Sequence, residues 1–184
     1  MSERPEILSV RLLAQTRLFR IEELDLRFSN GEERRYERLA GIAGGAVLVV
    51  PVHEGQLYLV REYAAGTERY ELGFPKGRID PGESPEETAN RELQEEIGLA
   101  AGRIEPLRAV TVAPGYFEHV THLLLARDLR VSRLEGDEPE AVEVVRWPLA
   151  DIDGLLGRED FTEARSLAAL FLALQKLQRG DPDA

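Results

Sequence analysis

Residues 76–99, KGRIDPGESPEETANRELQEEIGL, carry seven carboxylates but only three cations. If a helix covers 85–97, Glu92 and Glu96 are i, i+4 neighbours on one face, with Glu95 beside them. Like charges at this spacing destabilise a bare helix. A hard divalent cation reverses that effect, because carboxylate oxygens are its preferred ligands and Mg²⁺ often shares them with substrate phosphates. The pattern therefore indicates a Mg²⁺ or Mn²⁺ site for a phosphorylated substrate.

Charge runs on helices are more often solvated surfaces than sites, so composition alone favours a plain acidic helix face. The one cation within the expected helix is Arg91, which can pair with Glu83 and hold the preceding loop against the helix. Ser84, Pro85 and Glu87 form a helix-start signature, a Ser-x-x-Glu capping box with proline at the first helical position. Gly98 is a helix stop signal.

The elements around this helix are mostly strands. Alternating residues in 7–28, the Asn-Gly turn at 29–31 and the polar segment after it predict an antiparallel meander. The glycine-bounded apolar run 44–52 suits a buried strand, followed by a partner at 56–64. Later strands and two late helices predict an α+β fold with a curved mixed sheet between helices. We divide the chain into an N-terminal β subdomain, 1–42, and a main domain, 43–184.

Composition excludes several classes of function. The 184-residue chain has a net charge of −11, which argues against nucleic acid and anionic membranes as partners. It has no cysteine, so disulfides, thiolate catalysis and cysteine-based zinc sites are excluded. The sequence shows no signal-peptide pattern and no apolar run of membrane-spanning length, so a cytoplasmic protein is expected.

The specified positions of the acidic segment match a longer signature. Gly77, five residues, Glu83, seven residues, Arg91-Glu92-Leu93, one residue, Glu95-Glu96, one residue and Gly98-Leu99 reproduce the Nudix box over residues 77–99. The chain therefore resembles the Nudix hydrolases. That resemblance implies the Nudix fold and cleavage of a nucleoside diphosphate linked to another group, X.

The resemblance also implies roles for individual residues. Glu92 and Glu96 correspond to metal ligands, and Glu95 to a further ligand or base. Glu83 corresponds to a supporting or ligating acid with Arg91 as its structural partner. Gly77 lets the backbone approach the metal, and the carbonyl of Lys76 is a further candidate ligand.

Residues outside the box resemble the ADP-ribose pyrophosphatase branch of the family. Pro114 in TVAPGY follows the box by 15 residues, and Gly115 and Tyr116 follow it directly. This branch implies ADP-linked substrates, namely ADP-ribose, diadenosine triphosphate and NADH. It also implies a homodimer in which residues 1–42 help to build the partner's adenine site; the alternative is an N-terminal sheet that serves a single protomer.

Four further residues have both a functional and a structural interpretation. Arg61 contacts the diphosphate or is a surface strand residue, and Glu71 recognises substrate or pairs with Arg69 or Arg78. Glu138 and Glu140 lie in a polar loop, where this branch of the family can carry a glutamate that orients or deprotonates the attacking water. The alternative is an exposed acidic turn.

The expected function is thus metal-dependent hydrolysis of ADP-X to AMP and X-phosphate. Two alternatives compete with it. One is a Nudix enzyme for another nucleotide class, such as GDP- or UDP-sugars. The other is a module that binds ADP-ribose without cutting it, although such modules usually lack box acids that are all present here.

Overall fold

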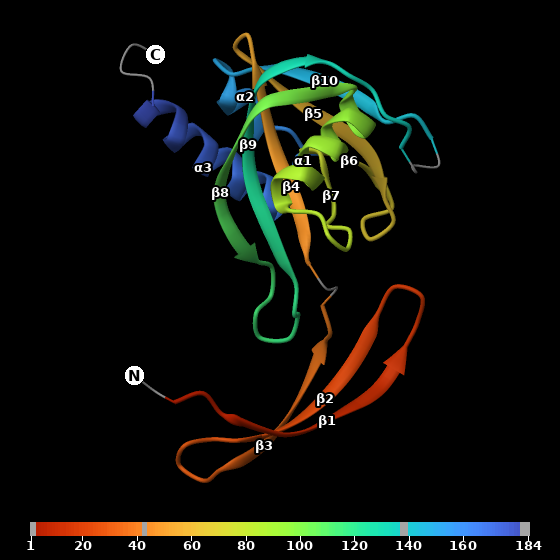
Figure 1. The fold of residues 1–184 in the computed structure, drawn as a ribbon, viewed down its shortest axis with the longest axis vertical. Helices are drawn as coiled ribbons and strands as arrows, with labels where there is room; N and C mark the ends of the chain where they lie inside the picture. Colours follow the sequence, from red (N-terminus) through yellow and green to blue (C-terminus); the bar gives the residue numbers. More distant parts are fainter. Residues whose placement is uncertain (1–2, 42–43, 137–139, 181–184) are drawn as a thin grey trace. The chain divides into compact units, whose positions relative to one another are not determined.

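The computed structural model describes residues 3–41, 44–136 and 140–180 (Figure 1). The chain forms two compact units: Met1–Ala43 together with Thr111–Val120, and Gly44–Val110 together with Thr121–Ala184. Glu138 lies outside the described residues, so its predicted role as a base stays a prediction.

The first unit is built on a three-stranded antiparallel sheet in the order β1-β2-β3. Its strands are β1 (Glu6–Gln15), β2 (Arg20–Arg27) and β3 (Glu33–Leu39), which confirms the predicted meander. Ion pairs across the strands hold this thin sheet together. Between strands, buried Glu22 pairs with Arg38 at 2.9 Å and buried Glu23 pairs with Arg11 at 2.6 Å, while Arg20 of the same strand pairs with Glu22 at 2.8 Å.

The loop after β8 belongs to the same unit and docks on the end of β3. The amide of Leu39 donates to the carbonyl of Tyr116 at 2.8 Å, and the amide of Glu118 donates to the carbonyl of Leu39 at 2.9 Å. A Cβ at Gly41 would lie 1.7 Å from the Glu118 carbonyl oxygen. Only a residue without a side chain therefore permits this approach of the two backbones.

The second unit contains a seven-stranded mixed sheet. Five strands run in the order β10-β5-β4-β9-β8, while β6 pairs with β5 and β7 pairs with β4. β4 and β9 are parallel, and β4 and β5 are antiparallel. The strands are β4 (Ala46–His53), β5 (Gln56–Ala64), β6 (Arg69–Gly73), β7 (Lys76–Arg78), β8 (Leu99–Thr111), β9 (Val120–Val131) and β10 (Glu143–Pro148). The helices are α1 (Pro85–Glu92), α2 (Ile152–Leu156) and α3 (Ala164–Gly180).

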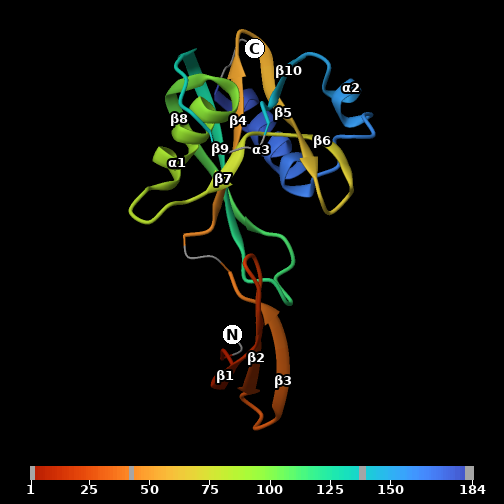
Figure 2. The ribbon, with the colours of Figure 1, turned by 90° about the vertical axis from the view of Figure 1, so that its right-hand side faces the viewer.

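Alternation along β4 explains how helices cover both faces of the sheet. Val47 and Val49 belong to one buried cluster, which includes Ala89 of α1. Leu48 and Val50 point the opposite way, into a cluster that includes α3. Figure 2 shows β4 and β9 between α1 and α3. The predicted sandwich of a mixed sheet between helices is confirmed, and its central strand is apolar on both faces because both are covered.

Two details differ from the sequence prediction. Residues 76–78, for which no strand is predicted above, form β7 and pair with β4. The predicted helix 85–97 changes character after Glu92, as described below. No helix among the described residues is long and apolar enough to cross a membrane.

Candidate active site

The acidic helix begins where the sequence predicts. The hydroxyl of Ser84 accepts a hydrogen bond from the amide of Glu87 at 3.2 Å, and the Glu87 carboxylate accepts one from the Ser84 amide at 2.8 Å. Pro85 occupies the first helical turn, where a missing N–H has no cost. Gly98 ends the helical segment with φ of 71°, the left-handed conformation typical of a stop.

The second half of the segment is a π-helical turn, Leu93–Ile97, so the prediction of a regular α-helix over 85–97 is wrong there. A π-helical turn closes i to i+5 hydrogen bonds and therefore changes the relative directions of side chains that an α-helix would align. Leu93 and Ile97 are buried in the core cluster under α1. Their neighbours Glu92 and Glu96 are buried as well, with 7% and 4% of their surfaces exposed. Two carboxylates, one from the last residue of α1 and one from the turn, are thus buried together with the apolar side chains.

Arg91 connects the acids of the box. Its guanidinium donates hydrogen bonds to Glu83 at 3.1 Å, Glu92 at 2.8 Å and Glu95 at 2.9 Å. It also donates to the carbonyl of Arg78 in β7 at 3.1 Å. These acids raise the pKa of Arg91 above its ordinary value, chiefly through the hydrogen bonds to Glu83. One side chain therefore ties the loop, the strand and the helix into a single constellation.

Glu83 is held in its charged form. It accepts hydrogen bonds from Arg91 and, at 2.7 Å, from the hydroxyl of Thr88. These bonds lower the pKa of Glu83 to about 2, with the bonds from Arg91 as the largest cause. A carboxylate that stays ionised over the whole physiological range is suited to support a cation site.

The backbone of β7 lies against two of the buried acids. A Cβ placed on Gly77 would lie 1.8 Å from an oxygen of the Glu92 carboxylate. The amide of Lys76 donates to the Glu96 carboxylate at 3.3 Å. The side chain of Lys76 turns elsewhere, to an ion pair with Glu62 of β5. A side chain at position 77 would therefore have to displace the Glu92 carboxylate.

The donor set of this constellation fits a divalent metal ion. Glu83, Glu92, Glu95 and Glu96 bring four carboxylates, against the single cation Arg91. Carboxylate and carbonyl oxygens are the ligands that Mg²⁺, Ca²⁺ and Mn²⁺ prefer. In the described parts of the chain, no three side chains of His, Cys, Asp or Glu already form an assembled metal cage.

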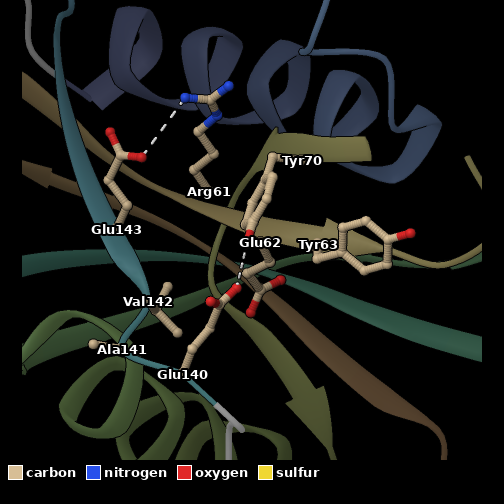
Figure 3. A pocket seen from close by; sticks show the side chains of 8 residues that line it. All are labelled: Arg61, Glu62, Tyr63, Tyr70, Glu140, Ala141, Val142 and Glu143. Atoms are coloured by element: carbon tan, nitrogen blue, oxygen red, sulfur yellow. Dashed lines mark hydrogen bonds and ion pairs between the residues drawn. The ribbon is translucent and has the colours of Figure 1, made fainter. Parts of the chain in front are cut away.

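A pocket of about 530 Å³ lies between β5, β6 and the segment that leads into β10 (Figure 3). Arg61 lines it, lies 3.7 Å from both Glu143 and Asp160, and is partly exposed. Its Nε is buried and has no hydrogen-bond acceptor among the described residues. Glu140 lines the same pocket and accepts a hydrogen bond from the hydroxyl of Tyr70 at 2.8 Å. The structure therefore brings two sequence candidates, Arg61 and Glu140, to one cavity.

The structure also shows the surroundings of the remaining candidates. Glu71 pairs with Arg69 at 2.8 Å and accepts from Thr162 at 3.1 Å, as its structural interpretation anticipates. Three others, Pro114, Gly115 and Tyr116, belong to the unit of the N-terminal strands and line a pocket of about 370 Å³ there.

Sequence reasoning missed several partners. Thr88 supports Glu83, and its position one turn into the helix was a usable signal. The pairing of Lys76 with Glu62 and of Tyr70 with Glu140 joins segments distant in the chain, so no local pattern pointed to either contact.

Comparison with known proteins defines the class of this chain. Residues 43–170 match the family model of the NUDIX domain. Because this match covers most of the chain, the protein belongs to the Nudix family. Residues 5–38 match a second model, the NudE-type Nudix hydrolase N-terminal domain.

Individual relatives agree with both assignments. The chain is 50% identical over 176 residues to ADP compounds hydrolase NudE of Escherichia coli K12, covering 96% of this chain and 95% of the relative. It is 32% identical to ADP-ribose pyrophosphatase of Bacillus subtilis 168, covering 79% of this chain and 80% of the relative. A crystal structure titled as an ADP compounds hydrolase matches with a TM-score of 0.90 and 49% identity, covering 98% of this chain and 97% of that one. The chain is thus a Nudix hydrolase similar to ADP compounds hydrolases along nearly its whole length.

Proposed function

We propose that this protein hydrolyses the diphosphate linkage of ADP-X compounds, namely ADP-ribose, diadenosine triphosphate and NADH, to AMP and X-phosphate. The observation that carries the proposal is the constellation of box acids. Glu83, Glu92 and Glu95 lie within hydrogen-bond distance of Arg91, and Glu96 accepts from the Lys76 amide. The names of the two relatives, ADP compounds hydrolase and ADP-ribose pyrophosphatase, support the ADP-linked substrate.

Nudix hydrolases use divalent metal cations, and we assign Mg²⁺ as the ion here, with Mn²⁺ as a substitute. The residues that would hold it are the acids of the box, the carboxylates of Glu92, Glu96 and Glu95 first, then Glu83 and the carbonyl of Lys76. When bound, such an ion neutralises phosphate charge and lowers the pKa of water. Arg91 acts by keeping these carboxylates in place, because it contacts three of them.

The protein's own groups handle the proton and the diphosphate. Water attacks one phosphorus of the diphosphate, and the bond from that phosphorus to the bridging oxygen breaks. The bridging oxygen stays with the other phosphorus, so X-phosphate leaves after attack on the adenosine-linked phosphorus, and AMP leaves after attack on the other one. A loop glutamate, Glu138 or Glu140, takes the proton of the attacking water. Arg61 binds the diphosphate through the exposed end of its guanidinium, because a guanidinium offers several donors to phosphate oxygens.

We further propose that the first 42 residues form a dimerisation and adenine-binding subdomain, assisted by Pro114, Gly115 and Tyr116. Support comes from β1, whose residues are all exposed, including Ile7 at 54%, Val10 at 49% and Leu12 at 48%. Exposed apolar side chains along one strand are typical of an interaction surface, and a second copy of the chain would cover them.

A product assay tests the function. The protein is incubated with Mg²⁺ and, separately, ADP-ribose, diadenosine triphosphate, NADH, GDP-mannose and dATP, and the products are separated by chromatography. AMP from the ADP-linked compounds, with little product from the others, is expected. Hydrolysis of GDP-mannose or dATP instead would assign another Nudix substrate class. Tight binding of ADP-ribose without cleavage would assign a sensor.

A further inference from the structure

The phenol of Tyr70 and the carboxylate of Glu140 meet across the pocket of Figure 3. Tyr70 lies on β6, and Glu140 lies 70 residues later, just before β10. The hydroxyl donates to the carboxylate with a separation of 2.8 Å. A hydrogen bond with a charged partner is shorter and stronger than a neutral one, so this contact can orient the acid.

Tyr70 is itself fixed in place. It is directly opposite Tyr63 in the β5–β6 pair, and the two rings pack edge to face with centroids 5.7 Å apart. The guanidinium of Arg61 lies over the Tyr70 ring, 5.9 Å from its centroid. Backbone pairing, ring packing and a cation over the ring together make the hydroxyl a defined point on the pocket wall.

Glu140 has much less local support. The pairing of β10 with β5 begins at Glu143, which is opposite Arg61, so Glu140 precedes the paired part of the strand. Its side chain is exposed, and the described part of the chain offers it one side-chain donor, the hydroxyl of Tyr70. Without that bond, the carboxylate would have several rotamers open to it in solvent.

We infer that Tyr70 is a positioning residue, whose hydroxyl holds the Glu140 carboxylate at the pocket in the orientation needed to receive the proton of the attacking water. This inference rests on the proposed function, in which Glu140 is one of two candidates for the base. The bond to Glu140 also raises the pKa of Tyr70, so the phenol remains a protonated donor at neutral pH. During turnover, Tyr70 donates to Glu140 and does not touch the reacting phosphorus.

Phenylalanine substitutions distinguish the contribution of the tyrosine hydroxyl from that of the ring. Tyr70→Phe keeps the contacts with Tyr63 and Arg61 and removes only the donor. Tyr63→Phe is the matched control, because it removes a hydroxyl from the neighbouring ring of the same pair. With ADP-ribose as substrate, Tyr70→Phe is expected to lower kcat by about three- to tenfold, the factor that corresponds to the net contribution of a typical hydrogen bond. KM should change by less than about twofold, since no direct substrate contact is lost.

A double-mutant cycle with Glu140→Gln identifies how Tyr70 acts. Glu140→Gln alone is expected to lower kcat by about 100-fold or more, as for loss of a general base. In that background Tyr70→Phe should have no further effect on kcat, because the group it positions is gone. Backbone amide exchange of residues 140–142 should also speed up in Tyr70→Phe and stay unchanged in Tyr63→Phe.

Distinct outcomes overturn the inference and the proposed function. A Tyr70→Phe variant with unchanged kcat and unchanged amide exchange overturns the inference. The inference is also overturned if Tyr70→Phe lowers kcat equally in the unmodified and the Glu140→Gln proteins, if it changes only KM, or if the Glu140→Gln variant is fully active. If the unmodified protein hydrolyses none of the ADP-linked compounds, the proposed function fails, and the amide exchange still tests the contact between Tyr70 and Glu140.

Discussion

Replacing Gly77 by alanine places one methyl group where the Glu92 carboxylate lies. The added Cβ would lie 1.8 Å from one carboxylate oxygen, 2.0 Å from Cδ and 2.5 Å from the other oxygen. Ordinary contacts of a Cβ begin near 3.4 Å, so the carboxylate or the strand must shift by more than 1 Å. Glu92 is buried and bonded to Arg91 at 2.8 Å, so neither group can move without disturbing the other.

The size of the effect follows from these contacts. Forcing a methyl group into a packed site typically destabilises a protein by about 1–3 kcal/mol. A displacement of about 1 Å in a catalytic group can lower the rate by about 100-fold. We therefore expect Gly77→Ala to remain folded, to lose about 100-fold in kcat/KM and to bind Mn²⁺ more weakly.

The control is Gly66→Ala, in the β5–β6 turn, where an added Cβ meets nothing within 4 Å. Urea unfolding, calorimetric titration with Mn²⁺ and initial rates on ADP-ribose measure the three quantities in both variants. If Gly77→Ala equals Gly66→Ala in rate and metal affinity, the acids of the box are not held as the structure indicates.

Three further substitutions probe the acidic segment of residues 83–96. Glu96→Gln should abolish turnover while circular dichroism and unfolding show an intact fold, and full activity would contradict its assignment as a metal ligand. Glu83→Gln should lower the free energy of unfolding, and this loss should be full above pH 4.5, the pKa of Glu83 in the unfolded chain. The loss should shrink as the pH falls toward about 2, because the pKa of Glu83 in the folded protein is lowered to that value. A loss that does not depend on pH in urea unfolding would argue against the pairing with Arg91. Ser84→Ala should cost about 1 kcal/mol of unfolding free energy through the lost cap, with kcat unchanged, and a variant of undiminished stability would mean that the capping box contributes nothing.

The parts of the fold that sequence predicts are those governed by local chemistry. Ser84 and Glu87 form a capping box because both bonds connect residues three apart, and Gly98 adopts the left-handed conformation that its type permits. The apolar run of β4 predicts a strand buried on both faces, and both core clusters use it. Such signals are complete within a few residues, so they can be recognised without a tertiary structure.

The parts that sequence does not predict depend on packing between distant segments. In the π-helical turn at 93–97, Leu93 and Ile97 are buried in the core, and Glu92 and Glu96 are buried beside them. Helix propensities of single residues do not predict such a turn. Arg91 was expected to reach Glu83, but its contact with the Arg78 carbonyl depends on the path of β7.

The most direct test of the account is hydrolysis of ADP-ribose in water labelled with ¹⁸O, followed by mass spectrometry. AMP and ribose 5-phosphate are expected in equal amounts, one of the two carrying a single ¹⁸O, and only when a divalent cation is added. The Glu96→Gln variant is expected to form neither product. Products formed without any divalent cation, or bound but intact ADP-ribose, would contradict the assignment of the box acids as the metal site of a diphosphate hydrolase.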